Sequence, residues 1–109
     1  MICPHCHNEQ TDQNYIGIAR CSICSRAFSV YHAEGRMYLD KGFYNEAIEN
    51  LILASRHMRR TALVFLDLAC AYAFIDNKEK MNEALERAKE IDPDFVKNNW
   101  KKPKKAKKV

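Results

Sequence analysis

The chain has 109 residues, of which 47% are hydrophobic and 29% charged, a balance typical of a globular protein. Three Gly and three Pro are too few for the turns of an all-β sandwich, and the isolated Gly residues exclude a Gly-rich phosphate-binding loop. The formal net charge of +4 is uneven. Residues 31–93 hold nine Lys and Arg against eleven Asp and Glu, whereas residues 94–109 hold seven Lys against one Asp.

Targeting signals are not apparent in the sequence. The first residues lack the basic flank and apolar core of a secretory signal. The longest apolar run, residues 62–75, is interrupted by Asp67 and is shorter than the ~20 residues of a membrane helix. We therefore expect a cytoplasmic protein with no membrane partner.

The first pattern along the chain is a pair of CxxC motifs with fourteen residues between them. Each motif forms a tight turn that directs two thiolates to one point, and two such turns make a closed tetrahedral site. In a reducing compartment this pattern favours a metal over disulfides. It predicts one structural Zn²⁺ per chain, with iron in a rubredoxin-like site as the less favoured alternative. The predicted ligands are Cys3, Cys6, Cys21 and Cys24.

Residues 1–30 resemble the short zinc-ribbon family found at the N-termini of many bacterial proteins. The family's parts are a CPxC knuckle near the first Met, an Arg-Cys-x-x-Cys knuckle, here beginning at Arg20, and Phe28 in the last strand. The family usually has Gly after a knuckle, where this chain has His7 and Ser25. His5 or His7 as a replacement ligand is an alternative. The residues expected behind the metal are Tyr15, Ile16, Ile18, Phe28 and Val30.

An internal repeat is found when the sequence is aligned with itself at an offset of 34 residues, with no gap. A 34-residue period of small and large apolar residues is the signature of tetratricopeptide repeats, which the chain resembles. The second copy matches the family better than the first, which has Glu34 and Arg59 where the family prefers Leu and Pro. The aligned pairs include Tyr31 with Phe65, Gly35 with Ala69, Tyr38 with Tyr72, Leu51 with Leu85, and Ala54 with Ala88.

Apolar spacing predicts helices over residues 31–41, 44–58, 61–75 and 78–91. Lys41 and Gly42 end the first helix, Asn77 caps the fourth, and Asp92 and Pro93 open a fifth through residue 100. The expected fold is mainly α: two tetratricopeptide hairpins and a capping helix in residues 31–100, with a small β zinc ribbon before them. No linker separates the ribbon from the first helix, so we expect the two to pack together.

The family resemblance implies a concave face, lined by the first helix of each pair, that binds a protein partner. The second copy presents an apolar strip there, which predicts a partner segment, a second copy of this chain or internal core as its cover. Some members of the family grip the carboxylate of a peptide's C-terminus with a set of Lys and Asn residues. Only Lys97 of this set is found here, so binding of an acidic C-terminal peptide is not expected. The candidate partner-binding residues are Arg36, Leu39, Leu63, Leu66, Cys70 and Phe74.

The Lys-rich segment of residues 101–109 cannot pack a core and is expected to be disordered. It is interpreted either as a solvated end or as an arm for nucleic acid or another polyanion. It also resembles a nuclear-import signal. The candidate polyanion-binding residues are Lys101, Lys102, Lys104, Lys105, Lys107 and Lys108.

Catalysis is not expected, because nothing orients a third group beside Cys70 and either His32 or His57. The sequence therefore predicts a small non-catalytic adaptor with a structural zinc ribbon and a protein-binding helical scaffold. The alternative is a factor associated with nucleic acid or ribonucleoprotein through the ribbon and the Lys-rich tail.

Overall fold

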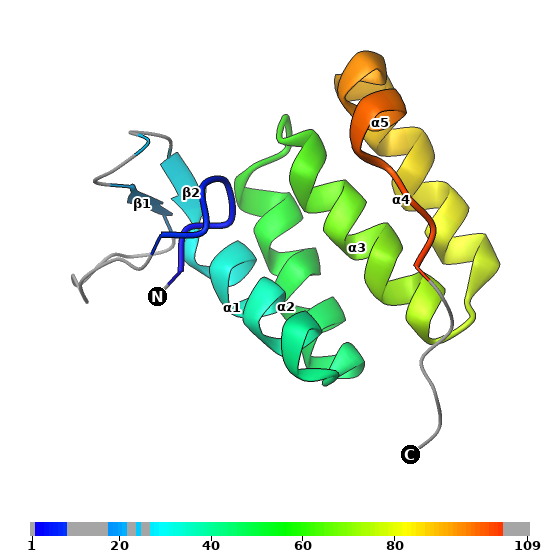
Figure 1. The fold of residues 1–109 in the computed structure, drawn as a ribbon, viewed down its shortest axis with the longest axis horizontal. Helices are drawn as coiled ribbons and strands as arrows, with labels where there is room; N and C mark the ends of the chain where they lie inside the picture. Colours follow the sequence, from blue (N-terminus) through cyan, green and yellow to red (C-terminus); the bar gives the residue numbers. More distant parts are fainter. Residues whose placement is uncertain (1, 9–17, 22–23, 25–26, 104–109) are drawn as a thin grey trace.

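The computed structural model describes residues 2–8, 18–21, 24 and 27–103. These residues form a two-stranded sheet and five helices (Figure 1). The elements in chain order are β1 (Ile18–Arg20), β2 (Ala27–Ser29), α1 (Val30–Lys41), α2 (Tyr44–His57), α3 (Ala62–Phe74), α4 (Lys78–Ile91) and α5 (Pro93–Asn99). The mainly helical fold is confirmed, and the predicted helices agree with the observed ones to within one or two residues.

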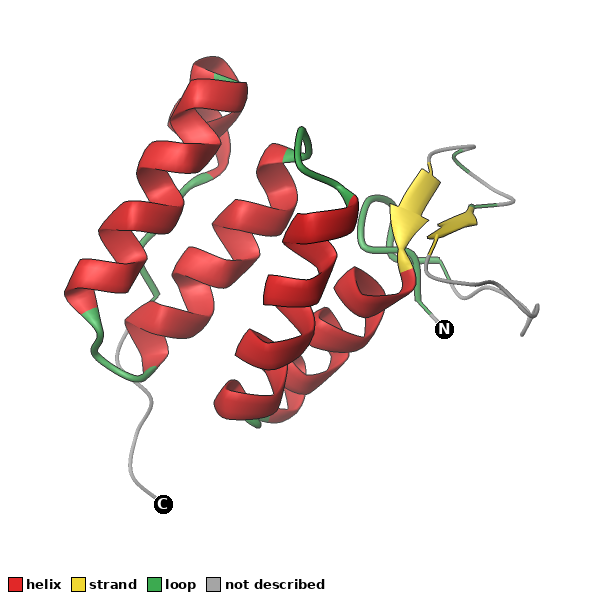
Figure 2. Ribbon diagram, turned by 180° about the vertical axis from the view of Figure 1, so that it is seen from behind, coloured by secondary structure: helices red, strands yellow, loops and turns green. Residues whose placement is uncertain are grey.

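The helices lie side by side in chain order, each packed against the next, and α5 packs on both α3 and α4 (Figures 1 and 2). The sheet lies beside α1 at one side of this array. No helix within the described residues is both long and apolar enough to span a membrane.

Short polar side chains and one Gly fix the helix ends. Ser29 caps α1 by accepting a hydrogen bond from the Tyr31 N–H, and Asn77 caps α4 by accepting from the Lys80 N–H. Gly42 ends α1 in the left-handed conformation with φ 82°, which Gly adopts without a Cβ penalty. These contacts explain why the helix boundaries were predictable from the sequence.

Helix α3 is the centre of the helical core. Its apolar residues face α2, α4 and α5, and Val64, Ala69 and Ala71 have no exposed surface.

A small residue allows α1 and α2 to approach each other closely. A Cβ added at Gly35 in α1 would lie 2.7 Å from the Leu51 Cγ of α2. The first hairpin is therefore packed more closely than an Ala at this position would allow.

The sheet has its own small core, which continues into the first helix. Ala19 pairs with Phe28 in antiparallel register, and both side chains are buried together with Ala33 of α1. Because strand side chains alternate, Ile18 points outward and is 46% exposed, so its predicted place behind the metal is wrong. The inward places of Phe28 and Val30 are confirmed, whereas Tyr15 and Ile16 lie outside the described residues.

Strand β2 runs directly into α1, because Ser29 is both the last strand residue and the cap of the helix. The expected packing of ribbon against helix is thus confirmed for the described residues.

Candidate functional site

The four predicted ligands come together at one point. Their sulfur atoms all lie within 4.8 Å of one another, with 3.5 Å between the Sγ atoms of Cys6 and Cys21 and 3.8 Å between those of Cys3 and Cys24. Sulfur ligands at about 2.3 Å from a tetrahedral zinc ion lie about 3.8 Å apart. The four thiols are free of disulfides and could hold a metal ion.

Backbone hydrogen bonds shape the N-terminal knuckle (residues 3–8). The Cys3 N–H donates to the Asn8 carbonyl at 3.0 Å, and the His7 N–H donates to the Cys3 carbonyl at 2.9 Å. His7 has φ 64°, so it takes the left-handed conformation for which the ribbon family usually has Gly. The knuckle therefore forms despite the departure from the family pattern, while Ser25 lies outside the described residues.

The two thiols of the knuckle have different environments. Burial raises the pKa of the Cys3 thiol to about 12. The Asn8 side-chain amide, 3.4 Å from the Cys6 sulfur, donates to it and lowers the pKa of Cys6 to about 6. Cys6 is thus largely a thiolate at neutral pH, while Cys3 keeps a proton that a bound metal would have to displace.

The histidines of the knuckle are not part of the cysteine cluster. The His5 ring meets the His32 ring of α1 edge to face, with 6.1 Å between centroids, and His7 is exposed. The donor set within the described residues is therefore four sulfurs, as the CxxC spacing predicts.

Beneath the knuckle lies a buried polar network that the sequence analysis missed. The Asp67 carboxylate of α3 lies 2.7 Å from His32 Nε2 and accepts a hydrogen bond from the Arg36 guanidinium at 3.0 Å. His32 and Asp67 are 0% and 5% exposed. The signal was available, because Asp67 is the charged interruption of the apolar run.

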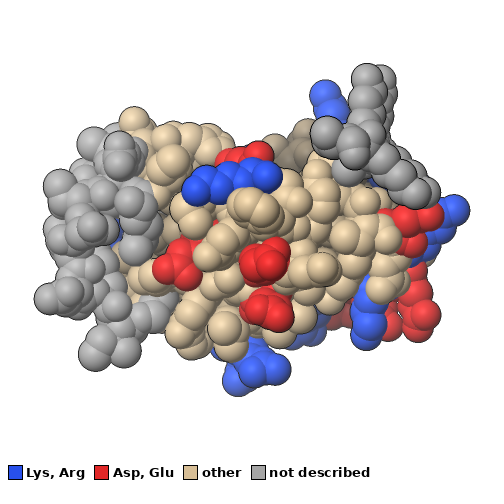
Figure 3. Space-filling view, turned by 90° about the horizontal axis from the view of Figure 1, so that it is seen from below, with Lys and Arg blue, Asp and Glu red and all other residues tan. Residues whose placement is uncertain are grey.

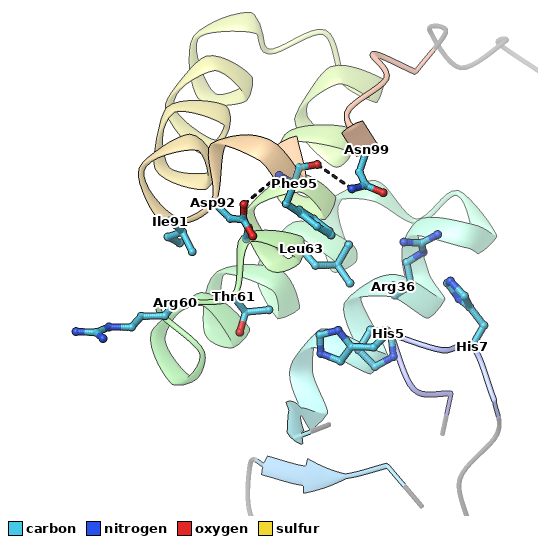
Figure 4. Close-up of a pocket in the computed structure, with 12 residues that line it drawn as sticks. His5, His7, Arg36, Arg60, Thr61, Leu63, Ile91, Asp92, Phe95 and Asn99 are labelled. Atoms are coloured by element: carbon cyan, nitrogen blue, oxygen red, sulfur yellow. Dashed lines mark hydrogen bonds between the residues drawn. The ribbon is translucent and has the colours of Figure 1, made fainter. Parts of the chain in front are cut away.

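A cavity of about 480 Å³ lies between the knuckle and the helices. In Figure 4, His5, His7 and Arg36 lie on one side of Leu63. Phe95 and Asn99 lie on the other side of Leu63. The Arg60 side chain extends away from all of these residues. The cavity is lined by Pro4, His5, His7, Arg36, Arg60, Thr61, Ala62, Leu63, Ile91, Asp92, Phe95 and Asn99.

Two of the six candidate partner-binding residues line this cavity, namely Arg36 and Leu63. Leu39 and Leu66 are 9% and 5% exposed and are packed in the helical core, which agrees with internal core among the alternatives for this face.

The other two candidates are half-buried and packed against the helical core. The Phe74 ring stacks on Tyr44 of α2, with 4.7 Å between centroids. Burial, followed by the charge of Asp67, raises the pKa of the Cys70 thiol to about 11.

Only part of the Lys-rich segment is described. Lys101 and Lys102 are exposed, whereas Lys104, Lys105, Lys107 and Lys108 lie outside the described residues.

Comparison of the chain with protein-family models, with curated proteins and with solved structures gives no match.

Proposed function

We propose that this protein is a non-catalytic adaptor in which a structural zinc ribbon holds the knuckle beside a protein-binding helical scaffold. The four-sulfur cluster supports the zinc assignment, because cysteine thiolates in a tetrahedral set favour Zn²⁺ and leave no position for a substrate. Thiols of this kind remain reduced in the cytoplasm, which is the compartment proposed for the protein.

The helical part is proposed to be two tetratricopeptide repeats, α1–α2 and α3–α4, with α5 as the terminal cap. The 34-residue repeat of the sequence and the chain-order packing of the helices support this assignment. In that arrangement α1, α3 and α5 form one face, from which Arg36, Leu63 and Phe95 reach the cavity.

The observation that carries the proposal is the cavity itself. It combines an apolar surface from Leu63 and Phe95 with polar groups from Arg36, His7 and Asn99, the mixture that binding sites use for contact area and orientation. One wall is the knuckle, so the metal site would hold the cavity in shape. A peptide segment of a partner protein is the proposed occupant.

A non-catalytic role agrees with the surroundings of the candidate nucleophile. The raised pKa of Cys70 leaves it a thiol at neutral pH, and a thiol is a poor nucleophile. His32 Nε2 lies against Asp67, and the His57 ring lies against Tyr31, so each histidine has another neighbour.

The test compares proteins that copurify with the zinc-loaded chain and with a Leu63→Glu/Phe95→Glu variant. The matched control is Leu53→Glu/Ile75→Glu, which places the same charges at exposed apolar positions outside the cavity. We expect a partner to be lost only from the cavity variant, with both variants shown by circular dichroism to be folded. An unchanged set of partners for a folded cavity variant would contradict the proposal.

A further inference from the structure

The junction of α2 and α3, residues 56–61, concentrates positive charge on one exposed turn, here called the arginine loop. Arg56, His57, Arg59 and Arg60 are all exposed. Three of the nine Lys and Arg residues between positions 31 and 93 therefore lie within five consecutive positions.

Within the described residues, these three arginines have no carboxylate within salt-bridge distance. On α4, by contrast, Lys80, Arg87 and Lys89 each pair with a Glu three residues away. The end of the molecule seen in Figure 3, opposite the α2–α3 junction, shows acidic side chains across its middle with basic side chains beside them. Among the described residues, the α2–α3 junction thus carries three arginines without a paired carboxylate.

The dipole of α2 explains only part of this cluster. Cations stabilise the last turn of a helix, where Arg56 and His57 lie, but this effect disappears beyond that turn. Arg59 and Arg60 follow the helix end and gain little from it. Their presence calls for another role.

The arginine loop is held in shape by its backbone. The Met58 N–H donates to the Ala54 carbonyl at 2.8 Å, and the Thr61 N–H donates to the Met58 carbonyl at 3.2 Å. A surface hollow of about 450 Å³ is lined by residues 56–61 alone. Arg60 lines both this hollow and the cavity beneath the knuckle, and its side chain extends away from Leu63 and Phe95 (Figure 4).

An aromatic pair adjoins the charges. The rings of His57 and Tyr31 lie 5.3 Å apart at 44°. Proteins that bind single-stranded nucleic acid combine cations along the backbone with aromatic rings on which bases stack. Guanidinium groups also match phosphate oxygens in a bidentate geometry.

The geometry points to a docking site for single-stranded nucleic acid on the arginine loop, in which Arg56, Arg59 and Arg60 contact phosphates and His57 stacks with a base. This site goes beyond the proposed adaptor function, and it differs from the Lys-rich tail because it is built into the folded part of the chain.

The test measures fluorescence anisotropy of a labelled mixed-sequence 20-nucleotide strand with the zinc-loaded full chain, between 50 and 200 mM salt. The test variant is Arg56→Gln/Arg59→Gln/Arg60→Gln. The matched control is Lys41→Gln/Lys78→Gln/Lys97→Gln, which removes the same charge from exposed residues scattered over α1, α4 and α5. Circular dichroism and zinc content check that both variants are folded.

We expect the arginine variant to lose about tenfold or more in affinity at the lowest salt, and the salt slope to fall by about 2, because each phosphate contact contributes about 0.7. The lysine control should lose less than about threefold. His57→Ala should weaken binding to the normal strand and leave binding to an abasic strand unchanged.

The inference would be overturned if the parent chain does not bind the strand at ~100 μM, or if the two triple variants lose the same affinity. It would also be overturned if binding is lost only when residues 101–109 are deleted. An equal effect of His57→Ala on the normal and the abasic strand would have the same meaning. Polyglutamate that competes as well as the oligonucleotide would also overturn it, because it would assign the loop to acidic proteins.

Discussion

Asp67 links α1 to α3 through both of its carboxylate oxygens, one facing His32 and the other Arg36. Such a group is costly to bury and is retained only with its partners in place. Its removal leaves neither ring nitrogen of His32 with a hydrogen bond to a described residue, since the buried Nδ1 atom already has none. The network therefore makes the packing of α1 against α3 depend on one carboxylate.

We predict that Asp67→Ala lowers the free energy of unfolding by about 3 kcal/mol or more, measured by urea denaturation. Asp40→Ala is the control, because it removes the exposed second partner of the same Arg36 and should cost less than about 1 kcal/mol. Equal losses in the two variants would show that the buried network contributes no more than a surface pair.

The thiols of the knuckle set the pH dependence of metal binding. With its pKa raised to about 12, Cys3 is protonated in the metal-free chain at neutral pH, so binding must release that proton. Cys6, with a pKa lowered to about 6, is largely a thiolate at pH 7 but gains a proton at and below pH 6.

We therefore predict that zinc affinity falls as the pH falls from 8 to 6, by about tenfold for each unit and each proton displaced. Competition with a colorimetric chelator at three pH values measures the zinc affinity. The fall in zinc affinity should become steeper at the pH where Cys6 also gains a proton. Asn8→Ala removes the donor that lowers the pKa of Cys6, so this change in slope should occur at a higher pH. An affinity that does not change with pH would contradict the thiolate assignment.

At the scale of elements, the crossing of α1 and α2 depends on the missing side chain of Gly35. In a free helix, Ala is more stable than Gly by about 1 kcal/mol. Here the new methyl group would meet Leu51, which is fully buried, and would lie 3.3 Å from the Ala47 carbonyl oxygen. Since neither neighbour has room to move, overpacking should exceed the gain in helix propensity.

We predict that Gly35→Ala lowers the free energy of unfolding by about 1–3 kcal/mol, measured by urea denaturation. Glu34→Ala changes the exposed neighbour on the same helix and should have little effect. A gain in stability at Gly35 would mean that the two helices lie further apart than the structure places them.

The elements also show what the sequence could and could not predict. Helix ends followed from Gly42, Asn77 and Asp92, and the cysteine cluster followed from the CxxC spacing alone. A three-residue strand carries too little periodicity to decide between Ile18 and Ala19, so the inner face was assigned wrongly. Similarly, a repeat pattern gives the face on which Leu39 and Leu66 lie but not the helices that cover it.

For the whole molecule, the main question is how far a metal ion bound by the four cysteines would support the helices. The ribbon core continues from Cys3 and Phe28 into Ala33 near the start of α1, whereas α3 lies in a separate apolar cluster with α2, α4, α5 and Leu39 near the end of α1. A small ribbon without its metal cannot bury enough apolar surface to fold. Loss of the metal should therefore reach α1 and stop before α3.

We predict about one zinc per chain and, after treatment with a strong chelator or in Cys21→Ser, faster amide exchange in β1, β2 and α1 with α3 still protected. Cys70→Ser is the control, because this cysteine lies outside the cluster and its loss should leave the zinc content unchanged. A folded chain that carries no metal would refute the zinc ribbon. Unchanged exchange in α1 would refute only its coupling to the metal.

The cavity beneath the knuckle has a consequence for how the chain folds. Most contacts in the helical array join elements that are neighbours in sequence, a topology that folds quickly because each such step closes a short loop. The cavity is different, because residues 4–7 and residues 91–99 form opposite walls. Bringing them together closes a long loop, so the walls should meet last during folding and separate first during unfolding. A ligand that bridges both walls would therefore slow the unfolding of the entire chain.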